Sequence, residues 1–186
     1  MQVHIETKRL IIRDLCVEDA KGIFKLDSDP KVHNFLGKKP IKTLGEAVEI
    51  IEFINQQYVE NGVGRWAVIE KETGRFIGWS GFKFITSSIN GRTNYYDLGY
   101  RFIREFWGRG FASESAQACL NHGFNKMNQE MFFAMADKNN LASNKILEKI
   151  GMSKIDEFQY EAVPHNFYQI NKNNWKNSTA VKNILQ

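Results

Sequence analysis

The short stretch Gly108-Arg109-Gly110 restricts what this chain can fold into more than any other part of the sequence. Before it, over residues 94–103, apolar and polar residues alternate as they do in a β-strand. After it, over 113–127, apolar residues recur at helical spacing. The chain must therefore pass from a strand into a helix within a few residues, which glycine permits because it adopts positive φ readily.

Such a turn has a chemical consequence at the start of the helix. The first helical turn leaves main-chain N–H groups without internal partners, and it carries a partial positive charge. Together these features favour binding of an anion such as a phosphate. Two common phosphate motifs do not fit, because no Lys-Ser or Lys-Thr pair follows the glycines and position 113 is Ser113 where a dinucleotide fingerprint needs glycine. The alternative interpretation is a tight turn that binds nothing.

The rest of the sequence reads as one domain over 1–186, with no linker, repeat or low-complexity tract. Strands are predicted over 10–13, 65–70, 76–84, 94–103 and 131–136, with two more between 152 and 175. Helices are predicted over 17–26, 44–60, 113–127 and 141–150. Thr43 and Glu46 form a capping-box signature at the start of the second helix. Residues 86–93 are expected to form a loop, and 176–186 to fray.

Composition excludes several classes of protein. No apolar run approaches the ~20 residues that a membrane-spanning helix needs, and residues 1–14 do not resemble a signal peptide, so we expect a cytoplasmic protein with no membrane partner. Cys16 and Cys119 lie far apart without a metal-binding pattern, so reduced thiols and no metal are expected. The net charge of +4 is spread without basic blocks, which argues against direct nucleic-acid binding and suits a small polyanion.

Four stretches, in this order, resemble the GNAT N-acetyltransferase family, and within it the RimJ/RimL branch of ribosomal-protein N-terminal acetyltransferases. They are ETKRLIIR (6–13), DPKVHNFL (29–36), LGYRF with WGRGFASESA (98–102 and 107–116), and NLASNKILEKIGM (140–152). The resemblance spans most of the chain. It implies an α+β (α/β three-layer) fold with a mixed, centrally splayed sheet of about six to seven strands flanked by about four helices.

The resemblance also implies acetyl-CoA as co-substrate and no metal. The strand edge near Phe102 and Ile103 would pair with the pantetheine arm, and Lys145 or Arg109 would meet the 3′-phosphate. Asn140 would contact the cofactor near its thioester, although it is equally suited to cap the helix that follows. Main-chain amides of the glycine-rich turn would hold the pyrophosphate; these belong to Gly108, Arg109, Gly110, Phe111, Ala112 and Ser113.

Two positions depart from the family pattern. Glu105 stands where the family usually has Gln or Arg, and Leu147 stands where many members have the tyrosine that protonates the leaving thiolate. We therefore predict Ser143, or a water held by Asn140, as the proton donor. Asp97 is the candidate general base, directly or through water, and its alternative interpretation is an exposed strand carboxylate.

Specificity for the acceptor is weakly encoded. Candidate acceptor-lining residues are His33, Phe35, Tyr100 and Tyr168, although aromatic residues at such spacing are often core residues. The expected reaction is acetyl transfer to a primary amine in a ternary complex, with a ribosomal or other protein N-terminus as acceptor. Two alternatives remain at this point: acetylation of a small amine or antibiotic, and a non-catalytic module that binds CoA or a peptide. A monomer or a homodimer is expected.

Overall fold

The computed structural model describes residues 2–177, so most of the tail that is expected to fray lies outside the described residues. Eight strands form one sheet in the order β1-β2-β3-β4-β5-β6-β8-β7. The strands are β1 (Val3–Glu6), β2 (Leu10–Arg13), β3 (Arg65–Glu70), β4 (Phe76–Ile85), β5 (Tyr95–Phe102), β6 (Met131–Asp137), β7 (Ser153–Tyr160) and β8 (Val163–Asn171). The helices are α1 (Ala20–Asp27), α2 (Leu44–Asn61), α3 (Phe111–Asn125), α4 (Leu141–Lys149) and α5 (Lys172–Asn177), with 3-10 turns at Val17–Asp19, Val32–Phe35 and Arg104–Phe106.

The predicted mixed α+β fold is confirmed, with two short elements that the pattern did not show. β1 has four residues and lies at the edge of the sheet, and α5 has six residues of mostly polar sequence. Elements this short span too few residues to display a period, so hydrophobic patterning does not reveal them. The described part of the chain therefore holds eight strands and five helices, where about six to seven and about four were expected.

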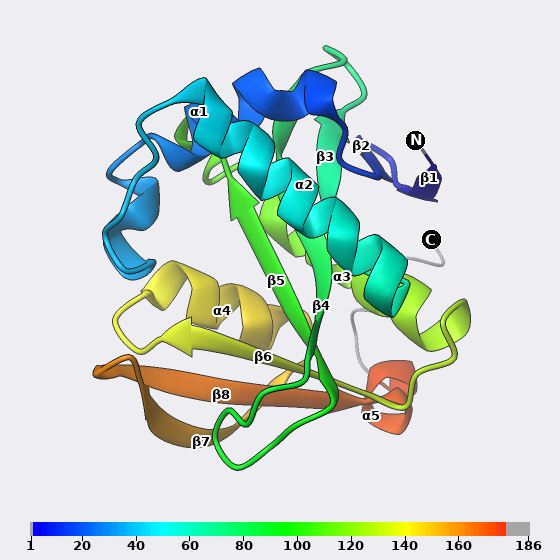
Figure 1. Cartoon of the computed structure of the whole chain (residues 1–186). Coiled ribbons are helices and arrows are strands. Elements are labelled where there is room, and N and C mark those ends of the chain that lie inside the picture. The colour runs from blue at the N-terminus through cyan, green and yellow to red at the C-terminus, as the bar shows by residue number, and fades with distance from the viewer. Residues whose placement is uncertain (1, 178–186) are drawn as a thin grey trace.

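The sheet divides between β5 and β6. β5 pairs with β4 over eight antiparallel residue pairs, from Gly78↔Phe102 to Ile85↔Tyr95. Against β6, which is parallel to it, β5 makes one pair, Asp97↔Phe133. Beyond that pair the two strands separate toward their C-terminal ends, and Figure 1 shows them diverging as the arms of a V. We call this region between β5 and β6 the wedge. The predicted central splay is confirmed.

Helices cover both faces of the sheet, as strand alternation requires. On β3, Ala67 and Ile69 pack in the cluster that holds buried residues of α1 and α2. Trp66 and Val68 point the other way, into the cluster that holds α3. Figure 1 shows α2 crossing one face of the sheet and α3 lying behind it. These two cores fix the plane of β3, β4 and β5, and so hold one arm of the wedge in place.

Local signals place the helix ends where the sequence predicts them. Glu46 N–H donates to Thr43 Oγ1 at 3.2 Å and Thr43 N–H donates to Glu46 Oε2 at 2.8 Å, which is the predicted capping box at the start of α2. Gly62 ends α2 with a φ of 68°. No helix within residues 2–177 is long and apolar enough to cross a membrane.

Candidate functional site: a glycine-rich turn and a wedge between two strands

The turn between β5 and α3 has the conformation that its glycines allow. Gly108 has a φ of 74° and Gly110, the N-cap residue of α3, a φ of 82°. A residue with a Cβ is strained at such angles, so both positions favour glycine for a conformational reason. The residues from Trp107 to Gly110 are exposed, so the turn can meet a ligand from solvent.

The main-chain donors of this turn have no acceptor in the part of the chain that the structure describes. The first N–H of α3 that bonds within the chain is that of Glu114, to Gly110 O at 3.1 Å. Within residues 2–177, no acceptor receives a hydrogen bond from the N–H groups of Gly108 through Ser113. Free N–H groups at the start of a helix, together with the positive end of its dipole, form an anion site. The site can therefore accept a diphosphate.

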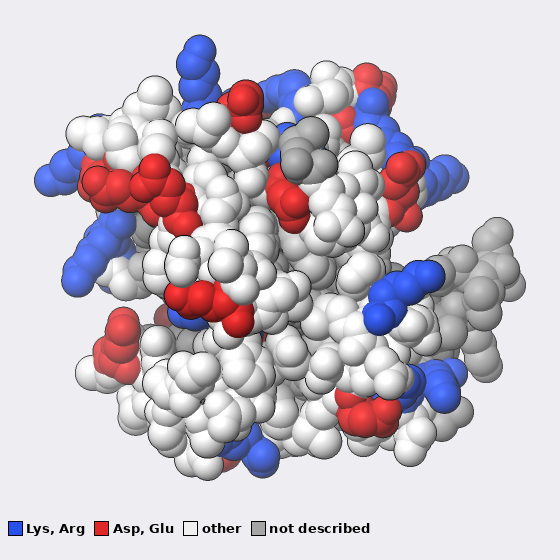
Figure 2. Space-filling view, turned by 45° about the vertical axis from the view of Figure 1, so that its right-hand side comes forward, with Lys and Arg blue, Asp and Glu red and all other residues white. Residues whose placement is uncertain are grey.

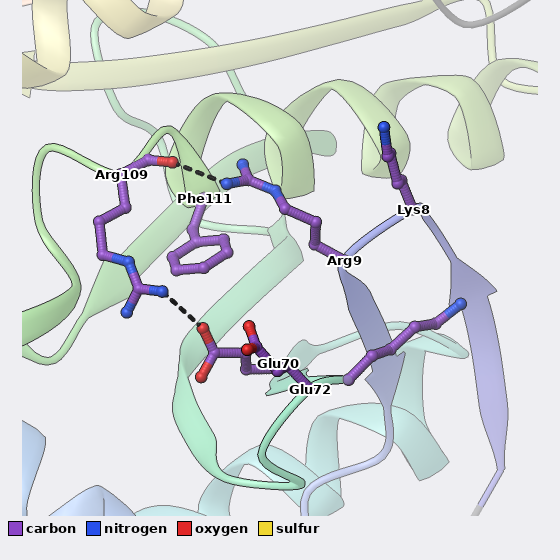
Figure 3. Close-up of a pocket in the computed structure, with 7 residues that line it drawn as sticks. Lys8, Arg9, Glu70, Glu72, Arg109 and Phe111 are labelled. Carbon is purple, nitrogen blue, oxygen red and sulfur yellow. Dashed lines mark hydrogen bonds and ion pairs between the residues drawn. The ribbon is translucent and has the colours of Figure 1, made fainter.

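The Arg109 side chain points away from that site. Its Nη2 lies 2.9 Å from Glu70 Oε1 on β3, and its guanidinium lies over the ring of Phe111 (Figure 3). The guanidinium also lies 5.4 Å from the centre of the Phe106 ring. Arg109 is thus already paired with a carboxylate, and the contact of its side chain with the 3′-phosphate stays a prediction. The other candidate for that contact, Lys145, is exposed on α4.

Glu105 also turns away from the phosphate cradle. Its carboxylate accepts from Lys25 at 3.0 Å and is paired with Arg75. The hydrogen bond from Lys25 comes first among the causes that hold the pKa of Glu105 below its usual value. A carboxylate that is paired in this way adds little repulsion to a bound phosphate, so this departure from the family pattern does not weaken the site.

On the edge of β5 that faces the wedge, one of the two residues predicted to pair with the pantetheine arm is not available. Ile103 N–H donates to Ile77 O at 3.0 Å, and Ile103 C=O accepts from Phe106 N–H at 2.9 Å. Both main-chain groups of Ile103 are therefore occupied, and the prediction that it pairs with the pantetheine arm is wrong. Because peptide groups in an antiparallel strand alternate between its two sides, Tyr100 and Phe102 present theirs to the wedge. Phe102 C=O accepts from the Trp107 indole at 2.7 Å. Among residues 2–177, the wedge-side groups at the C-terminal end of β5 without a hydrogen-bond partner are therefore Phe102 N–H and the N–H and C=O of Tyr100.

Two hydroxyl groups meet across the wedge. Tyr100 OH, from β5, lies 3.2 Å from Ser143 Oγ in the first turn of α4, and 3.2 Å from Ser143 C=O. Burial raises the pKa of the Tyr100 phenol, so it stays protonated at neutral pH. Asn140 caps α4 through a 3.1 Å bond from Ser143 N–H to its Oδ1, so the cap interpretation is confirmed. Leu147 is a buried core residue, so that position holds no group at the wedge surface.

Asp97 is not the exposed carboxylate of the alternative interpretation. It is 8% exposed, and its Oδ2 lies 2.6 Å from Arg65 Nη2. Arg65 also donates to the carbonyl oxygens of Asp97 and Gly81, at 2.8 and 2.6 Å. Burial raises the pKa of Asp97, against the opposing effect of Arg65. No residue within 2–177 donates to the other carboxylate oxygen, Oδ1.

The four predicted acceptor-lining residues are not brought together. Tyr168 is fully buried and its hydroxyl donates to Asn144 Oδ1 at 2.7 Å, so it belongs to the packing of α4 on β8 and lines no surface groove. His33 is buried with its Nε2 3.7 Å from Asp27 Oδ1. Phe35, in the same 3-10 turn, is exposed. Tyr100 alone among them reaches the wedge.

Sequence reasoning missed Arg65 and Arg9. Arg65 holds Asp97 from a strand that precedes it by 32 positions, and Arg9 reaches the glycine-rich turn across 100 positions. Periodicity reports only which face of a strand a residue occupies, so it carries no signal for such partners. The one available signal was the resemblance that includes ETKRLIIR, in which Arg9 lies.

No dominant patch of one charge is seen on the face of the described residues that Figure 2 shows. On the face shown in Figure 2, Lys and Arg side chains are scattered among Asp and Glu around a largely uncharged middle. Within residues 2–177, no group of three or more His, Cys, Asp or Glu side chains is arranged to hold a metal ion. The donors gathered at this site are main-chain amides and hydroxyl groups, which suit an anionic, amide-bearing organic ligand.

Comparison with known proteins agrees with this geometry. Residues 9–153 match the family model of the acetyltransferase (GNAT) domain. The uncharacterized N-acetyltransferase p20 of Bacillus licheniformis is 34% identical over 148 residues, which cover 80% of this chain and 81% of the relative. A solved structure of RimL, a ribosomal L7/L12 alpha-N-protein acetyltransferase in complex with coenzyme A, has a TM-score of 0.77 at 16% identity and covers 91% of this chain and 98% of its own.

A spermidine N-acetyltransferase from Vibrio cholerae, in complex with CoA and spermine, has a TM-score of 0.72 at 16% identity and covers 91% of this chain and 99% of its own. At such identities the two solved structures show the fold alone. The family match spans most of the chain, and it agrees with the splayed strands and the free amides of the turn. The chain therefore belongs to the GNAT acetyltransferases, acyltransferases that take acetyl-CoA as co-substrate.

Proposed function

We propose that this enzyme transfers the acetyl group of acetyl-CoA to a protein or peptide N-terminal α-amine, and that it lies in the RimJ/RimL branch of the family. The observation that carries the proposal is the combination of free amides at Gly108 through Ser113 with unpaired peptide groups on the wedge side of β5. The first would hold the diphosphate, and the second would pair with the pantetheine arm as a neighbouring strand would.

The acceptor class follows from proton chemistry. The amine must be neutral to attack the thioester, and an α-amine with a pKa of about 7.7–8.0 is partly neutral at pH 7, whereas a lysine amine at about 10.4 is not. We propose that Asp97 removes the proton of the acceptor amine. It acts through a water bound at Oδ1, since Oδ2 is paired with Arg65. A carboxylate that acts through water is a weak base, which fits an α-amine better than a lysine or polyamine.

The leaving group needs a proton donor, and we assign it to Ser143. As the tetrahedral intermediate collapses, the C–S bond breaks and its electron pair goes to sulfur. The Ser143 hydroxyl proton moves to the sulfur while the Ser143 oxygen takes a proton from a solvent water. Tyr100, 3.2 Å from Ser143 Oγ, positions that hydroxyl. Asn140 and the exposed Lys145 would contact the cofactor around α4. Phe35, exposed beside α1, is the acceptor-side residue that we retain.

Two experiments test the proposal. Calorimetric titration with CoA should show binding, and no binding would overturn the assignment of the site. Mass spectrometry of a peptide library incubated with acetyl-CoA should show one added acetyl group on N-termini. If spermidine or an aminoglycoside is acetylated and peptides are not, the acceptor is a small amine. Binding without turnover of any acceptor would support a non-catalytic module.

A further inference from the structure

Arg9, in the loop between β1 and β2, holds the glycine-rich turn from the side opposite to the wedge. Its Nη1 donates to Arg109 C=O at 3.0 Å, and its guanidinium lies 4.4 Å from the centre of the Phe111 ring. Its Nε donates to Glu114 Oε2 at 2.7 Å. One side chain thus contacts the turn and the first residue of α3, as Figure 3 shows, and also Glu114 in the first turn of that helix.

The bond to Arg109 C=O matters because of the peptide that follows it. In a trans peptide the C=O and the next N–H point in opposite directions. Holding Arg109 C=O toward Arg9 therefore directs Gly110 N–H to the other side, away from Arg9. Glycines at 108 and 110 leave this segment with unusual backbone freedom, so the orientation of its amides depends on contacts from outside the turn.

Glu114 needs a partner for a related reason. A carboxylate in the first turn of a helix interacts favourably with the dipole, but it repels a polyanion bound at the same helix end. Glu114 accepts from Arg9 Nε, from Arg9 N–H at 3.2 Å and from Thr7 Oγ1 at 2.6 Å. These bonds hold the carboxylate on the β2 side of α3 and balance its charge.

The hollow beside Arg9 is not itself an anion site. It measures about 280 Å³ and is lined by Lys8, Arg9, Glu70, Lys71, Glu72, Arg109 and Phe111. Three of its four cations are paired with carboxylates: Arg9 with Glu114, Arg109 with Glu70, and Lys71 with Glu6. Two of these cations, Arg9 and Arg109, therefore anchor the turn. The Arg109–Glu70 bond holds the side chain of the same residue whose carbonyl Arg9 holds.

We propose that Arg9 is a positioning residue for the diphosphate cradle, which it keeps aligned for acetyl-CoA without touching it. This inference rests on the proposed function, because it assigns the diphosphate to the amides of the turn. It concerns binding of the diphosphate alone. Loss of Arg9 should therefore leave both the pantetheine contacts and the chemistry at the wedge intact.

The test compares a thioester donor that has the diphosphate with one that lacks it. Arg9→Met keeps the apolar stem and removes the guanidinium. We expect the KM for acetyl-CoA to rise about tenfold with kcat unchanged, as loss of charge-assisted hydrogen bonds predicts. The kcat/KM for acetylpantetheine should not change. Arg9→Lys should recover part of the loss, and Lys8→Met, next to it in the same hollow, is the matched control.

Each outcome of this test either supports or overturns the role of Arg9. An Arg9→Met enzyme with an unchanged KM for acetyl-CoA overturns the inference, and so does an equal loss with both donors, because that indicates a general structural role. If Arg9→Met does not fold, Arg9→Gln replaces it, and an unchanged KM for acetyl-CoA in that folded variant also overturns the inference. Failure of the wild-type protein to bind CoA refutes the proposed function itself, and the inference with it.

Discussion

The two edges of β5 differ in how far their main-chain groups are paired within the fold. Toward β4, the strand is fully paired, and Arg65 adds a buried ion pair and two bonds to main-chain carbonyls. Toward β6, it makes one pair, and side chains such as Tyr100 and Ser143 meet across the gap. The same strand therefore uses one edge for stability and the other for binding. Substitutions on the first edge should mainly reduce stability, and those on the second should mainly reduce turnover. Asp97, which Arg65 holds and which we propose as the base, should contribute to both.

The largest effect is expected at the paired edge, for Arg65→Met. This change leaves Asp97 as a buried charge without its partner, which typically costs about 3–5 kcal/mol of unfolding free energy. Urea denaturation followed by circular dichroism measures it. The double variant Arg65→Met, Asp97→Asn should recover part of the loss. A single variant within 1 kcal/mol of wild type, about the level of an exposed pair, would show that this edge does not depend on the ion pair.

At the open edge, Ser143→Ala should act on turnover. Loss of a general acid typically costs about 10²-fold or more in rate, so kcat should fall about 10²-fold while the urea midpoint stays close to wild type. Thiol release from acetyl-CoA measures kcat. Ser153→Ala, an exposed serine on β7, provides the control. An unchanged kcat in the Ser143 variant would mean that another group or a water protonates the thiolate.

Tyr100→Phe tests the open edge further, because Tyr168 provides a matched control in the core. Without its hydroxyl, Tyr100 no longer orients Ser143, so we expect kcat to fall about tenfold, as for loss of one positioning hydrogen bond. Tyr168→Phe removes a buried hydroxyl bonded to Asn144, so it should lower stability by about 1 kcal/mol with kcat unchanged. If both variants lose only stability, Tyr100 is a core residue and has no role at the wedge.

The smallest effect is expected for Asn140→Ala at the start of α4. Loss of an N-cap costs about 1 kcal/mol, which a urea titration detects. If Asn140 also contacts the cofactor, the KM for acetyl-CoA should rise in addition. Asn140→Ser keeps a capping oxygen and should restore stability. A KM that recovers together with stability would assign Asn140 to the cap alone.

Local elements were predictable because their signals are local. The Thr43–Glu46 capping box, the 65–84 hairpin and the glycine-rich turn each depend on residues within a few positions of one another, and each forms as expected. Local signals do not identify residues that line an acceptor groove. His33 and Tyr168 looked like groove residues because aromatic and imidazole side chains suit both a groove and a core, and only their packing distinguishes the two.

The amino-acid sequence alone is enough to predict a strand, a glycine-rich turn and a helix with free amides at its start. Those properties follow from backbone preferences over about 20 residues. Three other features depend on the packing of the whole fold: Ile103 N–H bonds to β4, Glu105 and Arg109 turn away from the cradle, and Tyr100 meets Ser143. These outcomes join residues between 26 and 43 positions apart, or 80 for Glu105 and Lys25, and which side chains meet over such separations is set by strand register and helix packing.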